Sequence, residues 1–168
     1  MGEWHYVPDD GGEIVGPIPL DELLRLIRGG TLHEETYVRK EGSQDYLEAD
    51  CFTEIVVALG FDPGRIAAGY AADEKWARDK VYRMVRHQPE LAWNVLSRIA
   101  EQELPDAVLS EAAAGPLEDL LIYHGERFIA RLEEEARSNP GLRRLLTGVW
   151  RNNISQPVWD RVVALRET

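Results

Sequence analysis

The chain has 168 residues, of which 44% are hydrophobic and 29% charged, a composition typical of a soluble protein with a buried core. Its longest uninterrupted apolar run, Ile55–Leu59, is far shorter than the roughly 20 residues of a membrane-spanning helix. The net charge of −11 disfavours binding to nucleic acid and to anionic membrane surfaces, whereas it permits a basic protein partner.

The first sixty residues alternate between strand-like segments and glycine-rich turns. We expect strands at Glu3–Val7 and Tyr37–Arg39, with a tight turn at Asp9–Gly12 after the first of them. Apolar residues at helical spacing predict a helix over residues 20–27, and a second helix is expected at Ala49–Leu59. Together these elements predict a small α+β domain over residues 1–60.

The pattern changes after residue 60. Asp62-Pro63-Gly64 interrupts the chain, and Ala67–Ala72 is typical of a connection built from small residues. We therefore expect a linker over residues 61–73 and a second domain over residues 74–168.

This second domain carries almost exclusively helical signals. Apolar residues with helical spacing recur at 77–85, 91–99, 108–112, 128–136, 142–150 and 158–163. Gly115-Pro116 is expected to open one helix, and His124-Gly125 to end it. The stripe at 142–150 is the cleanest and predicts that Trp150 is buried. Short connections favour antiparallel neighbours, so the predicted fold class is an α+β domain followed by an all-α helical bundle.

The first domain also carries a spaced set of aromatic, glycine and proline residues. Trp4-His5-Tyr6 is followed after nine residues by Gly16-Pro17-Ile18, and then at fixed spacing by Leu23, Leu26 and Gly30-Thr31-Leu32. This set resembles the motif of GYF domains in its spacing, its glycines, its proline and its first two aromatic residues. Aliphatic or small residues replace the other rings of the motif, so the domain is similar to the divergent bacterial branch of that family.

GYF domains bind proline-rich peptides, because a pre-formed polyproline helix lies well across flat aromatic surfaces. The resemblance therefore implies a peptide-binding patch, here reduced to Trp4, Tyr6, Tyr37 and Tyr46. The alternative is that Trp4 and Tyr6, which alternate onto one face of their strand, pack beneath the helix at residues 20–27.

The helical half resembles an uncharacterised bacterial domain family in Pro89–Trp93, Ala114–Leu121, His124-Gly125 and Gly148–Trp150. Since that family has no assigned activity, the resemblance supports the fold and implies no mechanism. Trp93 lies off the apolar stripe of its helix, which makes it a candidate for an exposed aromatic anchor that binds a partner.

One group of residues has the chemical types of an acid–base or metal site: Glu118, Asp119 and His124. The alternative is helix-end chemistry, with the two carboxylates in a first turn and the imidazole in a last turn. Cys51 is expected to be buried beside Phe52. No metal-binding or phosphate-binding motif is present, so we expect no catalytic residues, no metal and no cofactor.

Charge is unevenly distributed along the chain. Residues 1–60 contain 4 Lys or Arg against 13 Asp or Glu, a net charge of −9. We therefore expect a non-enzymatic protein-interaction protein, with an acidic inhibitor or immunity-type partner of a basic protein as the more specific hypothesis. The alternatives are a proline-rich peptide-binding adaptor and an enzyme that uses Glu118, Asp119 and His124. Because Cys51 has no second cysteine to pair with, we expect a cytoplasmic location.

Overall fold

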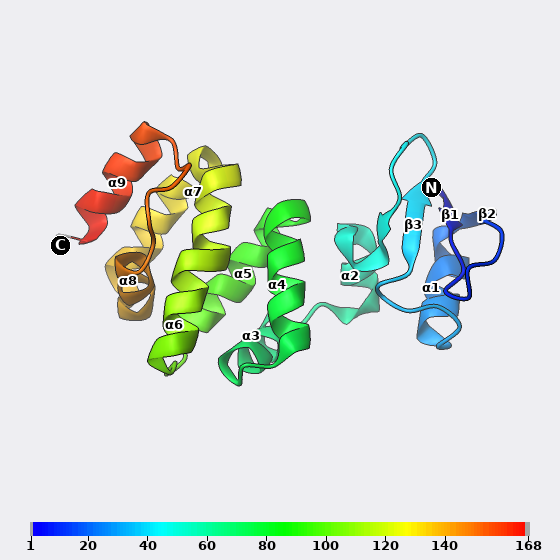
Figure 1. The fold of residues 1–168 in the computed structure, drawn as a ribbon, viewed down its shortest axis with the longest axis horizontal. Coiled ribbons are helices and arrows are strands. Elements are labelled where there is room, and N and C mark those ends of the chain that lie inside the picture. The colour runs from blue at the N-terminus through cyan, green and yellow to red at the C-terminus, as the bar shows by residue number, and fades with distance from the viewer. Residues whose placement is uncertain (1, 167–168) are drawn as a thin grey trace. The chain divides into compact units, whose positions relative to one another are not determined.

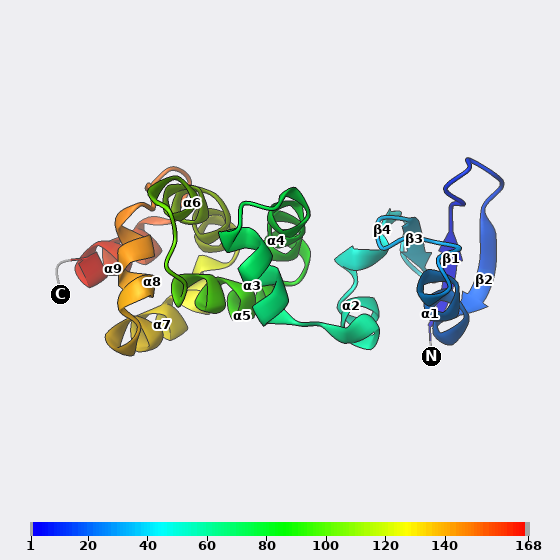
Figure 2. The same cartoon turned by 90° about the horizontal axis from the view of Figure 1, so that it is seen from below.

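The computed structural model describes residues 2–166 and divides into two compact units. The N-terminal unit runs to Phe61 and contains every strand of the described residues, and the C-terminal unit starts at Asp62 and consists, as far as it is described, of helical elements (Figures 1 and 2). The predicted fold class, a small α+β part followed by a helical part, is confirmed.

The N-terminal unit is built on a four-stranded antiparallel sheet with the strand order β2-β1-β3-β4. Its strands are β1 (Glu3–Tyr6), β2 (Val15–Pro19), β3 (Tyr37–Lys40) and β4 (Leu47–Glu48). The edge strand β2 contains Pro17 and Pro19, which fits the confinement of proline to the margins of sheets.

Helix α1 (Leu20–Arg28) packs on one face of this sheet. It begins directly after Pro19, carries Asp21 and Glu22 in its first turn and ends at Gly29. Its apolar stripe buries Leu23 and Leu24 against residues of β1 and β3, so the helix and the sheet share one core.

The helix expected at Ala49–Leu59 consists of two pieces, a short 3₁₀ turn at Ala49–Cys51 and helix α2 at Thr53–Gly60. Phe52, which separates them, has an extended backbone. Its ring packs edge-on against Trp4 with the centroids 4.8 Å apart. This contact supplies a physical reason for the interruption, because it places the Phe52 ring on the core of the unit.

Successive helices make up the C-terminal unit. They are α3 (Pro63–Ala71), α4 (Lys75–His87), α5 (Pro89–Ala100), α6 (Asp106–Ala112), α7 (Glu118–Ser138), α8 (Pro140–Thr147) and α9 (Gln156–Arg166). Helix α3 packs against α4 and α5, α4 against α7, and α7 against both α8 and α9. Figure 1 shows α8 and α9 together at the C-terminal end of this unit.

The expectation of a linker at residues 61–73 is wrong, because most of this segment is helix α3. Asp62 caps the helix by accepting a 3.0 Å hydrogen bond from the backbone N–H of Arg65, and Pro63 occupies the first turn. Ile66 and Tyr70 are buried. The segment read as a chain break therefore starts a helix of the bundle, as Asn139-Pro140 does for α8.

The predicted helix from Gly115-Pro116 to His124-Gly125 is also wrong at both ends. A π-helical turn at Ala113–Leu117 joins α6 to α7, and α7 continues through His124 and Gly125 to Ser138. A π turn accommodates Pro116 inside the helical run, because it relaxes the regular hydrogen bonding that proline interrupts.

Candidate functional site

The sheet of the N-terminal unit separates the four aromatic residues of the expected patch. Residues directly opposite each other in an antiparallel pair lie on the same face of the sheet. Tyr6 pairs with Val38, so Tyr6, and with it Trp4 two positions earlier, lies on the face of the sheet that helix α1 covers. Trp4 is only 1% exposed and Tyr6 is partly buried in the same core. The expectation of an exposed patch that includes Trp4 is wrong, because this tryptophan packs in the core of its unit.

Tyr37 lies on the opposite face of the sheet and is 53% exposed. On the same face, the guanidinium of Arg39 lies 5.4 Å from the centroid of the Tyr46 ring and donates a 3.0 Å hydrogen bond to the carbonyl of Ser43. Tyr46 is half-buried. This outer face, defined by Tyr37, Arg39 and Tyr46, keeps two of the four predicted aromatic residues accessible to a partner.

Negative charge is largely uncompensated by the cations of the N-terminal unit. Two of its four Lys and Arg side chains pair with carboxylates, Arg25 with Glu22 and Lys40 with Glu54. The other two donate to backbone carbonyls, Arg28 to that of Ala58 and Arg39 to that of Ser43. Eight carboxylates of the unit are exposed: Glu3, Asp9, Asp10, Glu13, Asp21, Glu35, Glu41 and Asp45. The unit therefore presents a strongly negative surface.

The loop between β1 and β2 combines acidic and apolar exposure. Asp9 anchors it by accepting hydrogen bonds from the buried hydroxyl of Thr36 at 2.9 and 3.1 Å. Asp10 accepts a 3.0 Å bond from the backbone N–H of Gly12, whereas Ile14 is 57% exposed. Hydrogen bonds thus hold this loop, while the aliphatic side chain of Ile14 remains exposed.

The expectation that Trp93 is an exposed anchor is wrong. Its side chain is fully buried and stacks on Phe128 with the centroids 5.6 Å apart. Its indole N–H donates a 2.8 Å hydrogen bond to Glu135 in α7. Trp93 therefore connects helices α5 and α7 and presents no surface to a partner.

Trp150 is 70% exposed, contrary to the prediction that it lies in the core. Helix α8 ends at Thr147, so the residues that follow leave the helical stripe. The carboxylate of the buried Glu118 holds the following turn, because it accepts a 2.9 Å bond from the backbone N–H of Trp150 and a 2.5 Å bond from the amide of Asn152. The exposed ring thus projects from an anchored turn.

Glu118 and His124, two of the three candidate acid–base residues, bind different parts of the helical unit. Glu118 binds the turn after α8, whereas Nε2 of His124 lies 3.0 Å from the carbonyl of Val85 in α4. Burial raises the pKa of Asp119, an effect that Arg86 opposes and Glu118 reinforces. Glu118 and His124 thus make separate structural contacts, so the geometry offers no support for the enzyme alternative.

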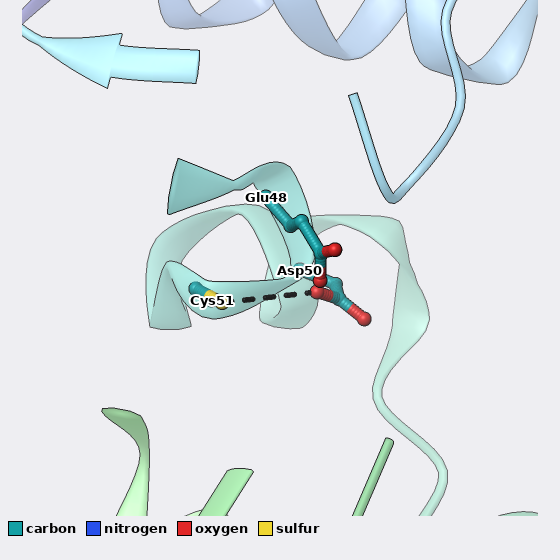
Figure 3. Close-up of side chains that lie close together, drawn as sticks. All are labelled: Glu48, Asp50 and Cys51. Carbon is teal, nitrogen blue, oxygen red and sulfur yellow. Dashed lines mark hydrogen bonds between the residues drawn. The ribbon is translucent and has the colours of Figure 1, made fainter. Parts of the chain in front are cut away.

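Glu48, Asp50 and Cys51 bring possible metal ligands together in the N-terminal unit (Figure 3). Their ligand atoms lie within 4.8 Å of one another, and Cys51 is buried as expected, with its thiol 4.0 Å from Oδ1 of Asp50. All three residues are already engaged in interactions within the protein. We therefore derive no metal chemistry from this cluster.

Sequence reasoning missed one cleft, which lies where α7, α8 and α9 meet and includes Arg137, Arg143 and Arg161. A local signal was present, because residues 137–166 contain six Arg and one Asp. This excess of Arg is not apparent from the net charge of the helical half, which is close to zero when counted as a whole.

Comparison with known families defines the class of each part. Residues 4–54 match the family model described as GYF domain 2, so the N-terminal unit is a GYF-type domain, a kind of protein-interaction module. Residues 66–168 match the model described as a family of unknown function (DUF6869), and the chain belongs to this family. Both resemblances drawn from the sequence are thereby confirmed.

No curated protein and no solved structure matches the chain. Among residues 2–166, no helix combines the length and the apolar composition that crossing a bilayer requires.

Proposed function

We propose that this protein is a non-enzymatic, cytoplasmic interaction protein whose N-terminal unit binds a basic segment of another protein. The observation that carries the proposal is the set of eight exposed carboxylates on a GYF-type domain, only two of whose cations pair with carboxylates inside it. Such a surface attracts a basic partner and repels an acidic one.

Charge accelerates association more than it adds affinity, so the binding energy requires contact groups as well. Tyr37 and Tyr46 on the outer face, together with Ile14 in the neighbouring loop, are the accessible groups of this kind. Tyr6 can contribute at most its exposed edge, and Trp4 and Trp93 are buried and offer no contact surface.

A proline-rich peptide is the second candidate ligand, because the GYF-type match, the exposed Tyr37 and the half-buried Tyr46 favour it. The two candidates can be separated with labelled nine-residue peptides of three repeats: Pro-Pro-Arg, Pro-Pro-Gln and Gly-Gly-Arg. Binding of both arginine peptides supports recognition of charge, whereas binding of both proline peptides supports the adaptor. If none of the three binds to the full chain, both proposals are wrong.

The electrostatic step has its own test, in which the association rate of the Gly-Gly-Arg peptide is measured against salt concentration. Neutralising Glu13, Glu35 and Asp45 as Gln, Gln and Asn should slow association at low salt, since these side chains are exposed. The matched control neutralises Glu103, Glu126 and Glu134 of the C-terminal unit as Gln. Equal slowing in both variants would contradict a binding surface on the N-terminal unit.

The narrower form of the proposal is an inhibitor or immunity-type partner of a basic toxin or enzyme. It requires that a basic enzyme captured from the source cell loses activity when this protein binds it.

A further inference from the structure

The meeting point of α7, α8 and α9 forms a cleft of about 600 Å³, a volume within the usual range of ligand-binding pockets. Among residues 2–166, its charged lining consists of Arg137, Arg143, Arg161 and one carboxylate, Glu133. Its apolar lining is supplied by Ala136, Ala164 and Leu165. Three guanidinium groups against one carboxylate, beside an aliphatic floor, make this cleft chemically unlike the acidic N-terminal unit.

Two of the arginines are held in place by the fold. Arg161 forms a two-pronged contact with Glu133, with N–O distances of 2.6 and 2.7 Å. Arg143 donates to the backbone carbonyls of Ala136 and Arg137 at the end of α7. These contacts fix the guanidinium groups at the rim without requiring an external anion.

Arg137 differs from the other two. Its side chain is exposed, and within residues 2–166 its guanidinium takes part in no hydrogen bond or close ion pair, although its charge helps to lower the pKa of Glu133. Glu133, the carboxylate nearest to it in the lining, is already bound by Arg161. An anion that entered the cleft would therefore find one guanidinium that is free to donate hydrogen bonds and two that are already oriented.

We propose that this cleft binds a short acidic peptide segment, with a carboxylate on Arg137 and an adjacent aliphatic side chain against Ala164 and Leu165. The surrounding segment supports an anionic ligand, since residues 137–166 carry six Arg and one Asp. The net charge of −11 does not prevent this, because at about 0.15 M salt charges farther away than about 8 Å are largely screened.

A peptide fits the lining better than a nucleic acid does. None of the described residues that line the cleft is aromatic, so it offers no ring on which a base could stack. Its aliphatic floor instead suits a side chain such as leucine. The site is separate from the surface proposed for the N-terminal unit, so either proposal can fail without the other.

The test uses the full chain and a fluorescein-labelled peptide, Glu-Leu-Glu-Leu-Glu, with Gln-Leu-Gln-Leu-Gln as the uncharged control. Fluorescence anisotropy should show binding of the glutamate peptide and at least about tenfold weaker binding of the glutamine peptide. Arg137→Glu should weaken binding of the glutamate peptide at least about tenfold, because it replaces a guanidinium that can donate to the peptide carboxylate with a repelling charge.

Arg144→Glu is the matched control. Arg144 is exposed on α8, lies outside the lining of the cleft and undergoes the same change of charge, so its effect should stay below about threefold. Equal weakening by the two variants, or no binding of the glutamate peptide, would overturn the proposal. Binding of inorganic phosphate that depends on Arg137, without binding of the peptide, would overturn it in favour of a small-anion site.

Discussion

The indole N–H of Trp93 in α5 donates a 2.8 Å hydrogen bond to Oε1 of Glu135 in α7. The same carboxylate accepts a 2.8 Å bond from the hydroxyl of Ser97 and a 2.9 Å bond from Nε of Arg131. One partly buried carboxylate thus satisfies donors from two helices, including the fully buried indole.

Replacing this carboxylate should destabilise the protein. Glu135→Ala leaves the buried N–H of Trp93 without its partner, and the expected loss in the free energy of unfolding is about 1–3 kcal/mol. The neighbouring Glu134 is exposed, so Glu134→Ala should change the same quantity by no more than about 0.5 kcal/mol. Urea unfolding of both variants measures the difference, and similar losses in the two would refute the role of Glu135.

Stability should depend on pH through the same residue. Burial raises the pKa of Glu135, but hydrogen bonds from Trp93, Ser97 and Arg131 outweigh burial and hold it below the ordinary value of 4.5. Because the pKa is lower in the folded than in the unfolded protein, the ionised carboxylate stabilises the folded state at pH values above the unfolded-state pKa. This contribution is lost as the pH falls through the folded-state pKa. The stability difference between the unmodified protein and Glu135→Gln should therefore shrink below pH 4.5. A difference that stays constant from pH 7 to pH 3 would contradict this.

Truncation of Trp93 and of Trp150 to alanine should lower the free energy of unfolding by very different amounts. Trp93→Ala removes a fully buried ring and should lower the free energy of unfolding by about 3–5 kcal/mol. Trp150→Ala removes a ring that is 70% exposed and should cost less than about 1 kcal/mol. Denaturant melts of the two variants decide the matter. A large loss for Trp150→Ala would mean that its ring is covered in solution.

Gly64 and Gly141 each follow a helix-capping Asp or Asn and a proline at the start of a helix, but their surroundings differ. A Cβ on Gly141 would lie 1.7 Å from the carbonyl oxygen of Ala100, whereas one on Gly64 would meet only Oδ1 of Asp62 at 3.3 Å. Gly141→Ala should therefore destabilise the protein by about 1–3 kcal/mol. Gly64→Ala should be neutral or stabilising, because alanine is favoured over glycine in helices by about 0.5–1 kcal/mol. Thermal melts that rank the two variants in the reverse order would contradict the close approach of α5 and α8.

The boundary between the units should lie immediately before α3. We expect fragments 1–61 and 62–168 each to unfold cooperatively. Fragment 74–168 should be less stable than 62–168, because it lacks α3 and therefore the buried Ile66 and Tyr70. Circular dichroism during urea unfolding of the three fragments measures this. Equal stability of the two longer fragments would mean that α3 contributes nothing to the bundle.

Local patterns predicted the parts of the fold that depend on neighbouring residues. The apolar stripe at residues 20–27 predicted α1, and the spacing from Trp4 to Gly30 predicted the GYF-type domain. Trp93 was misjudged because α5 is buried on more than one side, so a position off its main stripe still faces the core. Trp150 was misjudged because its stripe continues in the sequence after the helix has ended.

The remaining features depend on contacts between distant residues. Glu118 reaches a turn more than thirty positions away, and a carboxylate near a helix start carries no sign of such a partner. The cleft around Arg137 likewise exists only once three helices have packed. Charge counted over short segments was the one signal that could have indicated it.

The two prolines of β2 restrict how other chains can approach the N-terminal unit. β2 is an edge strand of five residues, and neither Pro17 nor Pro19 has a backbone N–H to offer to a further strand. This margin of the sheet is therefore a poor template for intermolecular β-pairing, which protects the β2 edge from edge-to-edge aggregation. A peptide cannot readily join the sheet beside β2 as an added strand, so recognition there has to rely on side chains.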